Sequence, residues 1–518
     1  MFKKRILALF LVGALLAAVL SACGDKKTQG TPGSDETGSS GEIVNGGELV
    51  IGIAQDLGDS LDPYQMTAAG TREVLFNVYE GLFKPDKDGN FIPAVAESKV
   101  KSEDGLSYTF TLRENVKFHN GAVVTANDVV KSFEACAATT VDTALAAALS
   151  TVKKVEAVDE KNVRLTLSEP NEDILSYVAS VYITPAGYAQ NATAPVGTGP
   201  FKFVSRAVQQ NVILQKNTEY WGTPAYLDKL TYQIFENNTA LMNALSAGSV
   251  DMAGHLTIDQ VNTLNTADFK TVEGTMNLVQ ALYLNHKAAP FDKEKVRQAL
   301  CYAINVDEIL ALTAEGHGTK VGTSIYPAFG KYFDQSLVGY YPYDVEKAKK
   351  LLAEAGYPNG FEMTITVPNN YTPHVNTAEV IVEQLAKVGI KATLNQVEWG
   401  TWLSETYQGR KFQSTVIGFD AVSLTAGALL NRWVSTDDKN MINYNDAQYD
   451  ELMQKANKTS DEKQRVDLYK QAAKRLTETA ANVYIQDLAD FVVMKKNLDG
   501  YEFYPLYVMD MAKLHYVK

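Results

Sequence analysis

Hydrophobic positions recur along this chain with two spacings, one typical of helices and one typical of strands. Apolar residues three or four positions apart predict amphipathic helices in 128–138, 293–310, 345–356 and 378–389 and, as a pair, in 449–480. Apolar runs bounded by turn residues predict strands at 361–368, 390–398 and 412–419. Helices and strands take turns over 344–419, which favours crossover connections, a largely parallel sheet and an α/β fold.

Polar residues and glycines mark several helix ends. Thr125 and Asp344 are candidate N-caps of the helices that follow them, because their side chains can accept from free backbone N–H groups. Thr377 is expected to begin the helix that runs toward Gly389. Gly356 and Gly389 are expected to close their helices.

Two further local features carry structural predictions. Residues 104–121 alternate in polarity and end in Asn120-Gly121, a turn dipeptide, so we expect a β-hairpin there. Arg297 lies in the predicted helix 293–310, where it is expected to serve as a structural ion-pair partner.

The first residues have the organisation of an export signal. Three cations, Lys3, Lys4 and Arg5, precede a short apolar run that ends at Leu20. The order Leu20-Ser21-Ala22-Cys23 resembles the bacterial lipobox, which implies that 1–22 is a cleaved signal peptide and that Cys23 carries lipid. Two acyl chains are enough for stable membrane attachment. The alternative is an ordinary signal peptide with a chance cysteine.

A polar segment separates the signal from the body. Residues 23–46 are rich in Gly, Ser, Thr and charge and have no apolar period, so we expect a flexible linker that carries the lipid anchor. The body begins at 47, near the strand-like run after Glu48. Its roughly 470 residues exceed what one core usually supports, which predicts two or three lobes.

Charge and cysteine content narrow the possible partners. The net charge of −13 argues against a nucleic-acid partner and against charge-driven binding to anionic lipid, so we expect membrane contact through the lipid anchor only. No apolar run after Leu20 is long enough to span a bilayer. Cys136 and Cys301 are expected to be buried thiols in different lobes, although an exported protein could pair them.

Five segments in order resemble the family-5 extracellular solute-binding proteins of ABC importers, the dipeptide, oligopeptide and nickel group. These segments are Leu61-Asp62-Pro63 with 74–98, then 104–134, 197–203, 282–310 and 344–361. The resemblance implies a substrate-binding lipoprotein, with no enzymatic activity and no cofactor. Such a protein captures a peptide and delivers it to the transmembrane subunits of a permease for import. We expect a monomer outside the cytoplasmic membrane.

The resemblance also implies a fold, the two-lobed type II periplasmic-binding-protein fold with an extra N-terminal subdomain. Lobe I is expected to comprise 47–286 plus 486–518, with the subdomain at about 91–195, and lobe II to comprise 287–485. A hinge is expected where the chain crosses between lobes, near 285–290 and 485–490. Ligand binding closes such lobes because the closed state makes contacts that the open state cannot.

Peptide binders of this family hold the ligand ammonium with a carboxylate that follows a Gly-aromatic pair. The matching pair here is Gly418-Phe419, and Val422 stands where the acid is expected. Asp420 lies two positions earlier, so it either substitutes for that acid or is a turn residue. Both readings remain open.

The other expected contacts come from the same resemblance. Dipeptide binders have an arginine before a Tyr-x-Pro, whereas Asn369 and Asn370 stand there in this chain, so both charge clamps of the dipeptide pattern look absent. This leaves a longer or modified peptide or a saccharide. Trp399 and Trp402 are candidates for stacking on ligand, with core packing as the alternative. The backbone of a loop is also expected to meet the ligand; its residues are Met66, Thr67 and Ala68.

Rival functions remain. The same binding role for an oligosaccharide or a nickel chelate is the first alternative, and His317, between two glycines, is a weak metal candidate. A secreted lipoprotein hydrolase is disfavoured, since the chain lacks Gly-x-Ser-x-Gly and His-Glu-x-x-His motifs. Import and presentation to a sensor are not distinguished by sequence.

Overall fold

The computed structural model describes residues 41–518, except for 55, 67, 140–144, 146–148, 172, 265–266 and 422. The predicted signal peptide 1–22, Cys23 and the linker as far as residue 40 therefore lie outside the described residues. Within the rest of the expected linker, Ile43–Val44 forms β1 and pairs with β22, His515–Val517. The end of the linker is thus part of the body, because its backbone groups bond to the C-terminal strand. Among the described residues, no helix is long and apolar enough to cross a membrane.

The first large sheet has seven strands in the order β13, β20, β12, β2, β11, β10, β9. The strands are β2 (Glu48–Ile53), β9 (Phe201–Ala207), β10 (Asn211–Lys216), β11 (Lys229–Ile234), β12 (Met252–Leu256), β13 (Phe269–Thr275) and β20 (Ala489–Lys495). Alternate residues of β2 are buried, with Leu49 and Ile51 fully enclosed in the core. The accompanying helices are α2 (Ala69–Leu75), α6 (Asn238–Ser246) and α7 (Ile258–Asn262).

A four-stranded antiparallel sheet with its own core lies between β2 and β9 in the sequence. Its elements are β5 (Ala96–Lys101), β6 (Ser107–Leu112), β7 (Val152–Ala157), β8 (Asn162–Leu167), α3 (Ala126–Ala137) and α5 (Ile174–Ser180), next to the pair β3 (Phe83–Pro85) and β4 (Phe91–Pro93). The hairpin predicted at 104–121 is wrong. Strand β6 pairs with β5 and β8, and Asn120-Gly121 only turns the chain at the isolated bridge between Lys117 and Val123.

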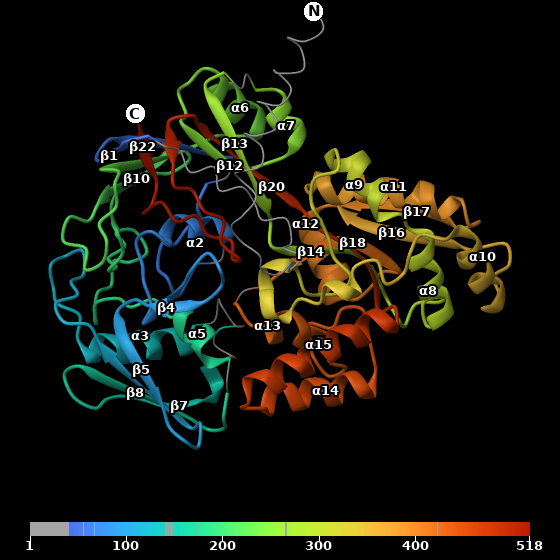
Figure 1. Ribbon diagram of the computed structural model, residues 1–518, viewed down its shortest axis with the longest axis horizontal. Coiled ribbons are helices and arrows are strands. Elements are labelled where there is room, and N and C mark those ends of the chain that lie inside the picture. Colours follow the sequence, from blue (N-terminus) through green and yellow to red (C-terminus); the bar gives the residue numbers. More distant parts are fainter. Residues whose placement is uncertain are drawn as a thin grey trace, which may run out of the picture. The chain divides into compact units, whose positions relative to one another are not determined.

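The second large sheet has six strands in the order β15, β19, β14, β18, β16, β17. The strands are β14 (Leu278–Leu284), β15 (Thr319–Lys320), β16 (Glu362–Pro368), β17 (Lys391–Val397), β18 (Ser414–Asp420) and β19 (Asn482–Asp487). Figure 1 shows α9 and α11 on one side of this sheet and α14 and α15 on the other, and each side has a separate hydrophobic core. The three predicted strands in this region are confirmed to within two residues at each end.

Helix predictions near this sheet have mixed outcomes. Asp344 caps α10 (Val345–Glu354), and the predicted pair at 449–480 is α14 (Ala447–Lys458) and α15 (Glu462–Glu478). The single helix expected at 293–310 is two, α8 (Glu294–Ala303) and α9 (Val306–Ala314). The chain breaks there because the Asn305 side chain caps α9 by accepting from Glu308 N–H at 3.2 Å.

Helix α11 spans Thr372–Ala386, so the predicted start at Thr377 is five residues late. Pro373 lies in the first turn, where its fixed backbone angle suits a helix and its missing N–H costs nothing. The side chain of His374 is buried, and its Nε2 accepts from Gly418 N–H at 3.2 Å. The first turn of α11 is therefore bound to the end of β18.

The chain passes between the two large sheets twice, from β13 to β14 at 275–278 and from β19 to β20 at 487–489. The second passage lies within the expected hinge at 485–490. The first lies about ten residues before the expected boundary at 286, because β14 pairs with β18 and β19 and so belongs to the six-stranded sheet. Cys136 and Cys301 are buried in different hydrophobic cores, as expected.

Candidate functional site

Three neighbouring parallel strands end at one edge of the six-stranded sheet. Strand β16 is parallel to both β17 and β18, and these strands end at Pro368, Val397 and Asp420. Open α/β sheets bind ligands outside the carboxyl ends of their strands. Both passages between the sheets lie at the same edge, since Leu278 at the start of β14 pairs with Asp420. The edge is therefore the candidate functional site.

Several predicted residues meet at this edge. Asn369 and Asn370 follow β16 and are exposed, and the ring of Tyr371 lies 5.2 Å from the ring of Trp399, which follows β17. Burial and, to a lesser degree, the charge of Asp420 raise the pKa of Tyr371, which places the end of β18 near the same ring. The structure thus brings together segments that are 20–50 residues apart in the sequence.

Trp399 and Trp402 have different environments. Trp402 is 2% exposed and donates from Nε1 to Thr415 Oγ1 at 3.0 Å, so it is a core residue rather than a ligand-stacking one. Trp399 is half-buried and stacks on Trp402, with ring centres 5.2 Å apart. Trp402 also begins a π-helical segment that runs to Gln408, a geometry frequent at functional sites. Of the two tryptophans, only Trp399 is partly exposed and so accessible to a ligand.

The end of β18 presents Phe419 and Asp420 to opposite sides. Phe419 is half-buried against the aromatic core, and the guanidinium carbon of Arg432 lies 4.0 Å from its ring centre. Asp420 is exposed, and no ion pair to it occurs among the described residues. Val422, at the position expected for the ammonium-binding acid, lies outside the described residues.

The loop before α2 contributes less than expected. The Met66 side chain is 5% exposed and packs in the core of the seven-stranded sheet, so only its backbone is left for a ligand. Ala68 is half-buried and is the N-cap residue of α2. Thr67 lies outside the described residues. The predicted contact of this loop with ligand stays a prediction.

The end of β19 and the start of β20 carry three buried acceptor atoms that have no hydrogen-bond partner among the described residues, Gln486 Oε1, Asp487 Oδ2 and Asp490 Oδ1. Buried polar atoms are normally bonded, so open acceptors indicate a place where water or a ligand donor binds. Burial raises the pKa of Asp487 to about 7, although its other oxygen accepts from Leu278 N–H at 3.1 Å.

Asp490 also belongs to a charged cluster beside this passage. His255 Nδ1 lies 3.0 Å from Asp490, and its Nε2 lies 2.7 Å from Glu73. Burial by itself would lower the pKa of His255, but the two carboxylates raise it well above the ordinary value. Tyr507 stacks on the imidazole at 4.5 Å. The cluster is thus an imidazolium between two acids, with one open oxygen on Asp490.

No metal centre emerges from these groups. Within the described part of the chain, no three or more His, Cys, Asp and Glu side chains are arranged to hold a metal ion. His317, the weak metal candidate, bonds through Nδ1 to Glu273 at 2.8 Å. Its ring is therefore engaged with a carboxylate of β13.

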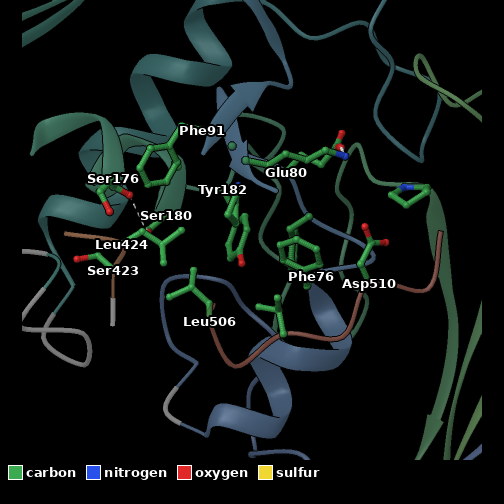
Figure 2. Close-up of a pocket in the computed structure, with 17 residues that line it drawn as sticks. Phe76, Glu80, Phe91, Ser176, Ser180, Tyr182, Ser423, Leu424, Leu506 and Asp510 are labelled. Atoms are coloured by element: carbon green, nitrogen blue, oxygen red, sulfur yellow. Dashed lines mark hydrogen bonds and ion pairs between the residues drawn. The ribbon is translucent and has the colours of Figure 1, made fainter. Parts of the chain in front are cut away.

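A small cavity lies next to the loop that follows β18 and is also lined by α5 and the C-terminal segment (Figure 2). It holds about 50 Å³, room for a few water-sized groups. Ser423 and Leu424 from that loop face Ser176 of α5 and Leu506 of the C-terminal segment across it. The hydroxyls of Ser176 and Ser423 are buried and have no hydrogen-bond partner in the part of the chain that the structure describes, which leaves two open hydrogen-bonding groups in the cavity.

Glu80 and Lys84 form the charged wall of this cavity. Glu80 is 3% exposed and accepts from Lys84 at 3.0 Å, Tyr220 at 2.6 Å, Trp221 at 2.8 Å and Thr198 at 3.2 Å. Burial alone would lower the pKa of Lys84, but the charge of Glu80 raises it. All the bonding capacity of Glu80 is thus used inside the protein, and the wall is preformed.

Sequence reasoning missed the cavity, the charged cluster and Arg432. Their members come from segments that are 100–400 residues apart, and no motif joins them. One signal was available for Arg432. It is a single cation in the apolar stretch 424–434 directly after the predicted Gly-aromatic pair.

Comparisons with known proteins show what this chain is similar to. A family model described as bacterial extracellular solute-binding proteins, family 5 Middle, matches residues 90–441. The glutathione-binding protein GsiB of Pectobacterium atrosepticum is 31% identical over 479 residues, which cover 86% of this chain and 91% of that protein. Heme-binding protein A of Haemophilus influenzae is 31% identical over 468 residues, covering 82% and 84%.

Among solved structures, the chain is similar to the periplasmic binding protein DppA of Helicobacter pylori in complex with the peptide STSA. The TM-score is 0.76 at 29% identity, and the match covers 92% of this chain and 99% of that one. Two of these proteins are named for different ligands, glutathione and heme, and the third is in complex with a peptide. Similarity at this level therefore leaves the ligand of this chain to be argued from its own residues.

Proposed function

The chain belongs to the bacterial extracellular solute-binding proteins of family 5, and from that premise we propose that it captures a peptide between its lobes and delivers it to an ABC permease. Proteins of this family bind substrates and are not enzymes, so the hydrolase alternative is set aside. The two-lobed type II fold expected from sequence is confirmed by the similarity to solved periplasmic binding proteins.

One observation carries the peptide proposal. Open hydrogen-bonding groups and exposed amides collect where the chain passes between the sheets, at the carboxyl edge of the six-stranded sheet. An extended peptide offers alternating N–H and C=O groups, which such an edge can bind with little regard to side chains. DppA of Helicobacter pylori binds a peptide, which supports the same ligand class here.

The passages at 275–278 and 487–489 are the proposed hinge between lobe I and lobe II. Each is only a few residues long, so rotation there would open the edge to solvent. Asp420 is the proposed partner for a ligand ammonium, since it is exposed at this edge and no cation of the described residues pairs with it. Asp420→Asn is expected to weaken binding only of ligands with an ammonium group.

The protein is proposed to act outside the cytoplasmic membrane, held by lipid on Cys23. The segment between Cys23 and the body would keep the loaded protein near its permease and raise its effective concentration there. Cys23→Ala is expected to leave ligand binding intact and to release the protein from membranes. Unchanged membrane fractionation would contradict the lipid attachment.

A thermal-shift screen of the full-length protein in detergent tests the ligand class. Di- to hexapeptides, oligosaccharides and nickel chelates are compared at equal concentration. A ligand at a hundred times its dissociation constant stabilises the native state by about 2.7 kcal/mol, which gives a visible shift. A response to peptides supports the proposal. A response to oligosaccharides alone would instead assign the exposed rings of Tyr371 and Trp399 to sugar stacking and contradict the peptide assignment.

A further inference from the structure

Arg432 is a half-buried arginine, and no acid of the described residues forms an ion pair with its guanidinium. It lies on the short helical turn Asn431–Trp433 that follows α13, Ala426–Leu430. Its Nε and Nη1 atoms are buried, and neither has a hydrogen-bond partner among the described residues. Burying a charge without a partner is costly, so this arrangement calls for a group that binds the guanidinium.

The immediate surroundings of Arg432 are aromatic. Its guanidinium carbon lies 4.0 Å from the centre of the Phe419 ring and 5.7 Å from that of Trp433. Ring faces attract and orient a guanidinium, but they leave its in-plane N–H groups free. The indole Nε1 of Trp433 is a further buried donor without a partner. Three open N–H donors therefore lie in one aromatic cluster.

No carboxylate of the described residues is available to bind these donors. Asp420 is the acid adjacent to Phe419, but successive strand residues point to opposite faces, and Asp420 is exposed while Phe419 packs inward. Among the described residues, no carboxylate forms an ion pair with Arg432. The neighbouring edge residues Asn369 and Asn370 are neutral. No acceptor for these donors is present among the described residues, which leaves the donors open to a group from outside the chain.

We propose that Arg432 binds a carboxylate of the ligand, with Phe419 as the platform that orients the guanidinium and Trp433 as an additional donor. This inference rests on the proposed function and narrows it to ligands that carry a carboxylate. A carboxylate accepts charge-assisted hydrogen bonds from a guanidinium, and these are stronger than the bonds that a neutral sugar hydroxyl or amide accepts. The anionic clamp that Asn369 and Asn370 lack is thereby supplied from the other side of β18.

Matched ligands test the proposal on the full-length protein in detergent. Tri- and tetrapeptides are titrated calorimetrically in three forms: the free acid, the C-terminal amide, and the amide with one glutamate side chain. Free acids are expected to bind about tenfold or more tightly than neutral amides, the usual effect of a charge-assisted hydrogen bond. Recovery of affinity by the glutamate form would show that the carboxylate comes from a side chain. Equal affinity for all three forms would overturn the proposal.

Variants test whether Arg432 causes the difference in affinity between free acids and amides. Arg432→Gln is expected to bind acids and amides equally, and Arg432→Lys to keep part of the difference. The matched control is Arg475→Gln, because Arg475 already donates to both oxygens of Asp446, at 2.6 and 3.1 Å. This control should discriminate like the wild type. Discrimination that survives in Arg432→Gln would contradict the assignment.

A second measurement needs no peptide. In a nitrogen–proton correlation spectrum of arginine side chains, the Arg432 Nε signal is identified by its loss in Arg432→Gln. Acetate at about 0.1 M is compared with chloride at the same ionic strength. Acetate should shift this signal and chloride should not, because the carboxylate accepts hydrogen bonds from the open donors. No shift would overturn the proposal. If acetate shifts the signal but no peptide binds, the peptide function is rejected and the carboxylate site at Arg432 is kept. If peptides bind but acetate causes no shift, the carboxylate site is rejected and the peptide function is kept.

Discussion

Arg297 and Arg432 lie in the same lobe and are both withdrawn from water, yet their surroundings differ. Arg297 is 6% exposed and donates to three backbone carbonyls, those of Ala480 at 3.0 Å, Phe291 at 2.9 Å and Thr479 at 3.0 Å. The donors of Arg432 meet aromatic rings instead. The ion pair expected for Arg297 is wrong, because its partners are backbone carbonyls, which carry no net charge. Each of its three guanidinium nitrogens donates to one of these carbonyls.

The comparison separates two uses of the same side chain. Arg297 joins α8 to the segment before β19, and every donor it buries has an acceptor in the protein. Arg432 closes no such contact and leaves its donors at the end of β18. Filled donors indicate a structural role, and open donors beside a candidate site indicate recognition. Five substitutions test this distinction.

The largest effect is expected for Arg297→Met. Three buried carbonyls would lose their donor together, which should lower the free energy of unfolding by about 3–5 kcal/mol. Urea denaturation measures this loss. The ligand affinity of the folded fraction should be unchanged. A loss of stability below about 1 kcal/mol would contradict a structural role for Arg297.

Asp487 is an open acceptor in the core, and its charge is expected to cost stability as pH rises. Its pKa is about 7 in the folded protein because of burial, against about 4 for an unfolded chain. Between these values the folded state holds more protons, so stability should fall as pH rises from 4 to 7. Leu278 N–H bonds the carboxyl and Asp490 lies near it with a like charge.

Asp487→Asn removes that charge and should flatten this part of the stability profile. At pH 8 the variant should be more stable than the wild type by about 2 kcal/mol or more, and at pH 4 the two should be equal. Denaturant unfolding across this pH range provides the measurement. A variant that is less stable at pH 8 would mean that the ionised carboxylate is bonded in the folded protein.

Trp402 and Trp433 allow the same comparison between a bonded and an unbonded buried donor, here the neutral indole N–H. Both are nearly fully buried, at 2% and 1% exposed, but Trp402 Nε1 donates to Thr415 and Trp433 Nε1 has no partner among the described residues. Trp402→Phe loses a hydrogen bond that Trp433→Phe does not. The first variant should therefore be less stable than the second by about 1 kcal/mol in urea unfolding. Equal losses would show that the bond contributes nothing net.

The smallest effect on stability is expected for Arg432→Met. It removes a desolvated charge and keeps most of the apolar stem, so the free energy of unfolding should change by about 0.5 kcal/mol at most, or increase. The same urea experiment used for Arg297→Met gives the direct contrast. A loss as large as that of Arg297→Met would make Arg432 a structural residue.

Local features were predictable because their partners are close in the sequence. Thr125 caps α3 in a capping box with Asp128, and Asp344 caps α10, since each bond reaches only three residues ahead. Strands β16, β17 and β18 were predicted to within two residues from their apolar runs. The false hairpin at 104–121 fails for the opposite reason. Its strand β6 finds a partner in β8, more than 50 residues away.

The candidate site was predicted in part. The resemblance named Asn369, Asn370, Trp399, Phe419 and Asp420, and the structure places these five at or near one sheet edge. Met66 and Trp402 lie in hydrophobic cores instead. Sequence does not separate these cases, because an apolar side chain that contacts a ligand has the same sequence pattern as one buried in the core next to the site. The contacts of the remaining residues with ligand stay predictions.

The sequence by itself determined the helix caps, the alternation of helices and strands, the family and the region of the binding edge. These depend on short-range bonds and on long segments that recur in order. The tertiary structure alone decided which polar groups are filled and which are open. Arg297 reaches Thr479 across 182 positions, while Nε and Nη1 of Arg432 have no acceptor among the described residues. Burial and pairing are properties of packed neighbours, and packing joins residues whose separation carries no signal in the chain.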